Sequence, residues 1–170
     1  MAVNWTMWEA IGTVGATIVA LFFGLFTLIR EFRNRPKIVL QHEESDILRN
    51  PNNNVDTYYI RVTNRGSTTA KKCTIRVLEA SQEDSHFVSP LERYHIFFED
   101  AIQNGDYIST NFIHNHKSEE WFSTPGGKDK KFPREKTKFI LLISGDNFPS
   151  YEKKITVEPR EGTKDLKIIL

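Results

Sequence analysis

The chain has 170 residues, of which 39% are hydrophobic, 26% charged and 12% aromatic. This composition supports one globular domain with its own core and excludes a wholly disordered chain. Lys and Arg number 23 against 22 Asp and Glu, and a net charge of +1 gives no indication of nucleic-acid binding. The single cysteine, Cys73, excludes an intramolecular disulfide and a cysteine-rich zinc site.

An uncharged apolar segment covers residues 10–29. As a helix, a segment of this length spans about 30 Å, the thickness of the hydrocarbon layer of a membrane. A cleavable signal peptide is the nearest alternative, but it begins with basic residues, and residues 1–9 contain no Lys or Arg. We therefore expect a retained transmembrane helix over 10–29, preceded by a short extracytoplasmic tail over 1–9.

Basic residues crowd the C-terminal end of this segment, in a connector over 30–36 and just beyond it: Arg30, Arg33, Arg35 and Lys37. Lys and Arg favour the cytoplasmic side of a membrane. The pattern predicts a single-pass protein of the inner membrane, with its N-terminus outside and its C-terminal domain in the cytoplasm. Pro36 is expected to end the helix or to impose an extended backbone on its neighbours.

Small residues recur every four positions along the apolar segment, at Gly12, Ala16, Ala20 and Gly24. Such a ridge allows two helices to approach closely in lipid, so self-association or contact with a partner's helix is one interpretation. Gly and Ala are also frequent in membrane helices in general, and that alternative stays open.

After Pro36 the hydrophobic pattern changes to a period of two, which is typical of half-buried strands. Tyr58, Ile60 and Val62 fall on one face of their strand, and the run Phe139–Ile143 is apolar on both faces, which predicts a central strand covered above and below. We expect loops over 43–56 and 125–131. The expected strands cover 37–41, 57–64, 72–79, 107–114, 120–123, 136–144, 152–158 and 166–170.

The segment 90–103 allows two interpretations. Ser89, Pro90 and Glu92 resemble the start of a helix, and Leu91, Tyr94, Phe98 and Ile102 recur at helical spacing, so a short helix is favoured. The alternative is a strand over 93–98, because Tyr94, Ile96 and Phe98 also alternate and so short a run does not decide the period.

About seven short strands separated by turns predict an antiparallel β-sandwich over 37–170. The segment Tyr59–Gly66, followed by Ala70 and the run Cys73–Val77, resembles the hairpin of CARDB-like, immunoglobulin-type domains. Small prokaryotic membrane proteins that carry such a domain after one N-terminal helix are similar over most of this length. The resemblance implies an immunoglobulin-like sandwich with a binding or scaffold role and without catalytic residues.

Aromatic and basic residues gather between 121 and 134, and we take them as the candidate contact surface: Trp121, Phe122, Lys128, Lys130, Lys131 and Arg134. Such a surface suits anionic lipid headgroups or a partner protein. The alternative is a solvated loop whose two aromatic side chains are turned into the core. Nearby acidic residues, such as Glu119 and Asp129, argue against nucleic acid.

The sequence contains no nucleophile elbow, no phosphate-binding glycine loop and no cysteine with a placed histidine. His114 and His116 would share one strand face, but two ligands are too few for a metal site. We therefore predict no catalytic residues, no metal and no cofactor.

Together these features predict a membrane-anchored, non-catalytic binding or scaffold protein. Its cytosolic sandwich would recruit a protein partner, with an exposed sheet edge that accepts a strand. The alternative is an outward-facing, anchored module that binds a ligand such as a carbohydrate.

Overall fold

The computed structural model describes residues 5–50, 52, 54–82, 85–88, 94–125 and 130–170. The chain divides into two compact units, residues 1–35 and residues 36–170. Lys128 and the helix-start residues Ser89–Glu92 lie outside the described residues.

The first unit is one long helix, α1 (Trp5–Arg33). Its segment Ile11–Arg33 contains an 18-residue window with a mean hydropathy of 2.1 and is long and apolar enough to cross a membrane. Every side chain from Ile11 to Arg35 is exposed, so the helix is not the buried core helix of a soluble domain. It extends beyond 10–29 at both ends because no helix breaker intervenes, and it stops ahead of Pro36.

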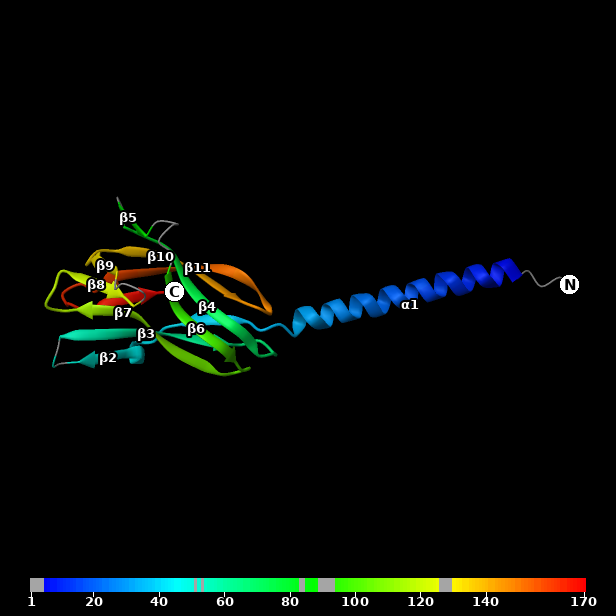
Figure 1. The fold of residues 1–170 in the computed structure, drawn as a ribbon, viewed down its shortest axis with the longest axis horizontal. Coiled ribbons are helices and arrows are strands. Elements are labelled where there is room, and N and C mark those ends of the chain that lie inside the picture. The colour runs from blue at the N-terminus through cyan, green and yellow to red at the C-terminus, as the bar shows by residue number, and fades with distance from the viewer. Residues whose placement is uncertain (1–4, 51, 53, 83–84, 89–93, 126–129) are drawn as a thin grey trace. The chain divides into compact units, whose positions relative to one another are not determined.

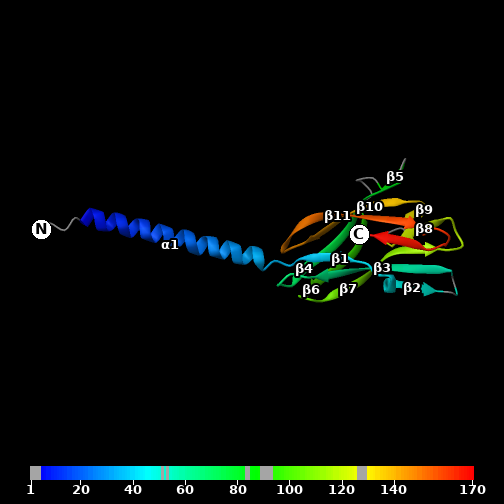
Figure 2. The ribbon, with the colours of Figure 1, turned by 180° about the vertical axis from the view of Figure 1, so that it is seen from behind.

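The second unit consists of two six-stranded antiparallel sheets (Figures 1 and 2). Sheet A contains β1 (Ile38–Gln41), β2 (Ile47–Asn50), β3 (Val55–Asn64), β7 (Tyr107–His116), β8 (Trp121–Thr124) and β9 (Lys130–Pro133). Sheet B contains β4 (Ala70–Gln82), β5 (Ser85–Val88), β6 (Tyr94–Ile102), β10 (Thr137–Gly145), β11 (Phe148–Pro159) and β12 (Leu166–Ile169). The predicted mainly-β sandwich with an N-terminal apolar helix is confirmed, with more strands than the seven expected.

Each sheet has one edge shared by two strands. In sheet A the order is β1-β3-β7-β8-β9, and β2 pairs with β3 beyond the end of β1, after the short 3-10 helix η1 (Glu44–Asp46). In sheet B the order is β12-β11-β10-β4-β5, and β6 also pairs with β4. The predicted loop over 43–56 therefore contains η1 and β2, and β9 begins at the end of the predicted loop over 125–131.

The hydrophobic core lies between the two sheets. Tyr58, Ile60 and Val62 of β3 are completely buried, as the alternation predicts. Four phenylalanines continue the core in series, with ring centroids 5.3 to 5.5 Å apart: Phe112, Phe139, Phe132 and Phe122. Each fully buried ring contributes about 2 kcal/mol or more, so this series is a main source of stability.

The helix favoured within 90–103 is wrong for the described residues 94–102, which form strand β6. β6 pairs with β4 from Ala70↔Ile102 to Val77↔Tyr94. The physical reason is that β4 needs a partner for the backbone groups along this edge, and the pairing overrides the helical spacing. A shift of register between Ile75 and Arg76 also brings both Ile96 and Phe97 to buried positions.

The expectation that β10 is a central strand covered on both faces is confirmed for its position in the sheet and for one face only. Phe139, Leu141 and Ile143 point into the core and are fully buried. Ile140 and Leu142 point to the other face of sheet B and are only half-buried.

Candidate functional site

The predicted contact surface is divided by the alternation of β8 and β9. Phe122 of β8 is fully buried and stacks on Phe132 of β9, with ring centroids 5.5 Å apart. The prediction that Phe122 belongs to the surface is therefore wrong. Successive side chains of a β-strand point to opposite faces of the sheet, so Trp121 and Phe122 cannot both lie on the outside. The alternative of a core position was right for Phe122 and wrong for Trp121.

Trp121 lies half-buried on the outer face of sheet A. The His116 ring is 4.1 Å from its ring centroid, and the Lys131 Nζ lies 4.2 Å from the same centroid. These contacts order the indole and occupy much of its surface. Of the predicted surface, Trp121 and Lys131 stay together on the outside, and Lys130 is half-buried.

Arg134 is not a free surface cation, because its guanidinium turns back toward β7. One terminal nitrogen donates to the Asn115 Oδ1 at 2.9 Å and to the His116 carbonyl at 2.8 Å. Asn115 is completely buried, and its amide in turn donates to the Lys164 carbonyl at 2.8 Å. Arg134 therefore connects β7 to the segment that leads into β12.

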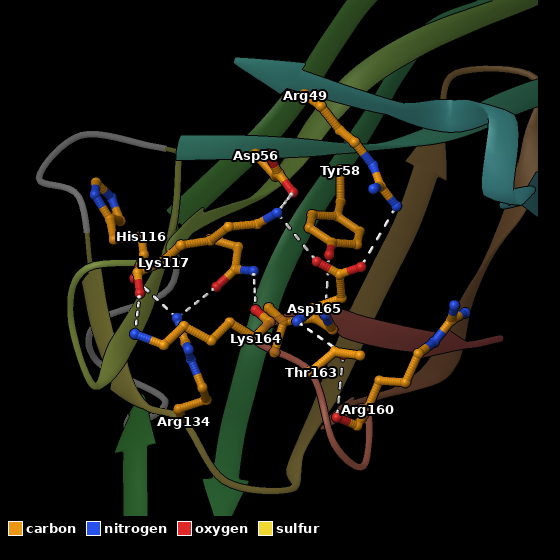
Figure 3. A network of polar contacts seen from close by, with 12 residues as sticks. Arg49, Asp56, Tyr58, His116, Lys117, Arg134, Arg160, Thr163, Lys164 and Asp165 are labelled. Carbon is orange, nitrogen blue, oxygen red and sulfur yellow. Dashed lines mark hydrogen bonds and ion pairs between the residues drawn. The ribbon is translucent and has the colours of Figure 1, made fainter. Parts of the chain in front are cut away.

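A network of polar contacts joins β3 and the end of β7 to the segment that leads into β12 (Figure 3). Its centre is Lys117, whose Nζ lies 2.8 Å from the Asp56 Oδ2 and 3.2 Å from the Asp165 Oδ1. The Asp56 side chain is only 3% exposed, whereas that of Lys117 is 28% exposed. Arg49 adds a second, longer ion pair to Asp165 at 3.4 Å. We refer to Arg49, Asp56, Asn115, Lys117, Arg134 and Asp165 as the polar network.

Tyr58 extends the polar network into the core. Its hydroxyl accepts a hydrogen bond from the Leu166 N–H at 2.9 Å, which joins β3 of sheet A to β12 of sheet B. Burial raises the pKa of Tyr58, so its hydroxyl stays protonated near neutral pH. With its charges paired in this way, the network joins strands rather than offering a free acid or base.

A second polar cluster lies on the outer face of sheet A, around Arg61 of β3. Arg61 forms ion pairs with Asp46 at 2.7 Å and Glu43 at 3.1 Å, and its Cζ lies 5.4 Å from the centroid of the exposed Tyr107 ring. Beside it is a shallow hollow of about 260 Å³, lined by Ser45, Asp46, Ile47, Leu48, Tyr59 and Ser109. Sequence analysis missed this hollow because η1 and β2 fell within a predicted loop.

Neither the contact between His116 and Ser123 nor the Cys73 thiol offers an accessible nucleophile. His116 Nε2 lies 3.4 Å from the Ser123 Oγ, but Ser123 is only 2% exposed, so its hydroxyl is not accessible to a substrate. Burial raises the pKa of the Cys73 thiol to about 11, which leaves almost no thiolate at neutral pH. Among the described residues, no group of three or more His, Cys, Asp or Glu could hold a metal ion.

The sheet edges differ in how open they are. β9 ends at Pro133, which has no N–H to donate, and the Pro133 carbonyl accepts a hydrogen bond from Gln82 at 3.0 Å. On β11, β12 pairs only with residues 156–159. Within the described part of the chain, the edge of β11 from Phe148 to Ile155 has no pairing strand.

The residues predicted to act in the membrane segment lie along α1. Gly12, Ala16, Ala20 and Gly24 are all exposed, and no atom lies within 4 Å of where a side chain would begin at Gly12 or Gly24. Arg30 and Arg33 occupy the last turn of α1, and the Arg35 guanidinium lies 4.1 Å from the centroid of the Phe32 ring.

Comparison with known proteins gives no family for this chain. No protein-family model matches it, and neither a curated protein nor a solved structure is significantly similar to it.

Proposed function

We propose that this is a membrane-anchored, non-catalytic binding or scaffold protein that presents its β-sandwich to a protein partner. The observation that carries the proposal is the complete exposure of the apolar side chains of α1 over Ile11–Arg33. Such a surface is stable in lipid and costly in water, so membrane lipid is its natural environment.

The orientation is also part of the proposal. Arg30 and Arg33 at the end of α1, with Arg35 and Lys37 beyond it, favour a cytoplasmic position for residues 36–170 in a cell (inner) membrane. No comparable basic residues precede the apolar segment.

The sandwich offers two features to a protein partner. The unpaired edge of β11 presents backbone N–H and C=O groups that an incoming strand can pair with. The pair Trp121 and Lys131 adds an ordered aromatic ring and a positive charge on the outer face of sheet A. Self-association of α1 through the small-residue ridge would place two sandwiches side by side and double the valency.

The orientation can be tested with two single-cysteine labels. Glu161 is exposed in the turn before β12, and Cys73 is buried with its pKa raised to about 11, so the native thiol gives little background. We expect a membrane-impermeant maleimide to label Ala2→Cys in intact cells and to label Glu161→Cys only after the membrane is permeabilised. Cys73 becomes labelled only after denaturation.

Labelling of Glu161→Cys in intact cells would contradict the cytosolic placement. It would favour the alternative of an outward-facing module for a ligand such as a carbohydrate. The hollow next to Tyr59 and Leu48 is the feature that favours this second candidate, because an aromatic ring beside polar groups suits a sugar.

A further inference from the structure

The outer face of sheet B carries an apolar strip where an exposed sheet face is normally polar. Ile140 and Leu142 of β10, the middle strand of this sheet, point to its outer face and are only half-buried, whereas Phe139, Leu141 and Ile143 on the core side are fully buried. Antiparallel sheets with one solvated face usually alternate between apolar and polar side chains. β10 does not alternate, so its sequence is that of a strand with a layer on both sides.

Charged residues of opposite sign flank this strip in register. Leu142 lies between Arg76 of β4 and Glu152 of β11, and both charged side chains are exposed. One row further along, Ile140 lies between Glu79 of β4 and Lys154 of β11. The sign of the charge therefore reverses both across the strip and from one row to the next.

This pattern is complementary to itself. A two-fold axis that runs along β10, in the plane between two facing copies, exchanges the β4 side of one copy with the β11 side of the other. Arg76 of each copy then faces Glu152 of the second copy, Glu79 faces Lys154, and the strips meet at the axis. Such an isologous arrangement also keeps the strands of the facing sheets nearly aligned, as in sheets that pack face to face.

We propose that the outer face of sheet B is the interface of a homodimer, and that the missing layer over Ile140 and Leu142 is the same face of a second copy. A second copy fits because the charges that flank the strip complement themselves under a two-fold rotation. The face extends over β6, β4, β10, β11 and β12. At the usual strand spacing and rise this gives roughly 700 Å² per copy, close to the roughly 800 Å² per partner of a standard interface. This interface is independent of α1 and of the orientation in the membrane.

The test uses single charge reversals in the full chain in detergent micelles. We expect the unchanged protein to form dimers in sedimentation equilibrium. Arg76→Glu and Glu152→Arg each place two like-charged pairs in the interface, and each is expected to raise the dissociation constant about tenfold or more. Arg65→Glu and Glu161→Arg are the matched controls, because both residues are exposed in turns outside this face and should leave the constant unchanged.

Mixing the two single variants gives the sharper result. In a mixed dimer, the glutamate introduced at position 76 of one chain faces the arginine introduced at position 152 of the other. The second pair consists of the two unchanged residues, Glu152 of the first chain and Arg76 of the second, so both pairs are again opposite in sign. Two variants that associate weakly alone should therefore form heterodimers when mixed, with a constant close to that of the unchanged protein. An effect confined to one chain would not produce this rescue.

Circular dichroism establishes that each variant is folded, and exposed charged residues of a sheet face are expected to tolerate reversal. A monomeric unchanged protein would overturn the proposal. A dissociation constant that neither charge reversal changes would overturn the proposal too, because the dimer would then form through another surface, such as α1. Folded variants that fail to associate on mixing would equally refute the two-fold arrangement.

Discussion

Lys117 joins the two sheets through ion pairs with two carboxylates. It follows β7 of sheet A and pairs with Asp56 of β3 and with Asp165, which precedes β12 of sheet B. The hydrogen bond to the Asp56 carboxylate, against the opposing effect of burial, raises the pKa of Lys117. A buried carboxylate that loses such a partner is left with an uncompensated charge.

Lys117→Ala is expected to lower the free energy of unfolding by about 3 kcal/mol, because it leaves the Asp56 carboxylate buried and unpaired. Lys167→Ala is the control: its ion pair with Glu158 at 3.5 Å is exposed, and its loss should cost less than about 1 kcal/mol. Urea unfolding followed by circular dichroism measures both. Equal losses would show that the buried pair contributes no more than a surface pair.

The pH dependence of this contribution follows from the raised pKa of Lys117. The folded protein binds the lysine proton more tightly than the unfolded chain, so the stabilisation is complete below the ordinary lysine pKa of about 10.4 and is lost as the pH rises through the raised value. The difference in stability between the unchanged protein and Lys117→Ala should therefore shrink at alkaline pH, as Lys117 loses its proton.

At the scale of elements, the β10–β11 turn is attached to the start of β4. The Lys71 N–H donates to the Asn147 side chain at 2.9 Å, and the Asp146 N–H donates to the Lys71 carbonyl at 3.0 Å. This attachment requires close approach at Gly145. A Cβ there would lie 2.8 Å from the Lys71 carbonyl oxygen and would clash with the Phe148 ring.

Gly145→Ala is expected to lower the free energy of unfolding by about 2 kcal/mol or more, because the Lys71 backbone cannot move without disturbing β4. Gly105→Ala is the matched control. Gly105 has φ of +82° but open space around it, so only the backbone conformation costs energy, about 1 kcal/mol. Denaturant unfolding compares the two, and a smaller loss at Gly145 than at Gly105 would contradict the packing argument.

At the scale of the whole molecule, residues 36–170 form their own compact unit with its own core. The polar network, the phenylalanine series and the Tyr58–Leu166 hydrogen bond all lie within this unit. A unit that contains its own stabilising contacts is expected to fold without its anchor.

Residues 36–170 expressed alone should therefore unfold cooperatively in urea, at nearly the same midpoint as the full chain in detergent. Trp121 is the only tryptophan in this unit, so its fluorescence reports the transition directly. The fragment should also stay in solution, while the full chain sediments with membranes. A fragment without a cooperative transition would show that stability depends on residues 1–35.

Sequence analysis located most long strands because their own residues alternate. The turn after β3 is held by the Asn64 side chain, which accepts from the Gly66 N–H at 3.0 Å and donates to the Thr68 carbonyl at 2.7 Å. The strands β2 and β9 were missed because they lie within or at the end of segments whose composition indicates a loop, and β5 was not predicted. Of the predicted contact surface, Phe122 is buried in the core and the Arg134 guanidinium turns toward β7, and the binding role of the remaining residues stays a prediction.

The sequence by itself determined the apolar helix and the alternating strands, since both follow from the order of neighbouring residues. The tertiary structure alone decided that 94–102 pairs with β4, that Lys117 meets Asp56 and Asp165, and that Ile140 and Leu142 of β10 are only half-buried. These features depend on contacts between residues far apart in the chain. No local pattern encodes such contacts, because their energy appears only when distant strands are brought together.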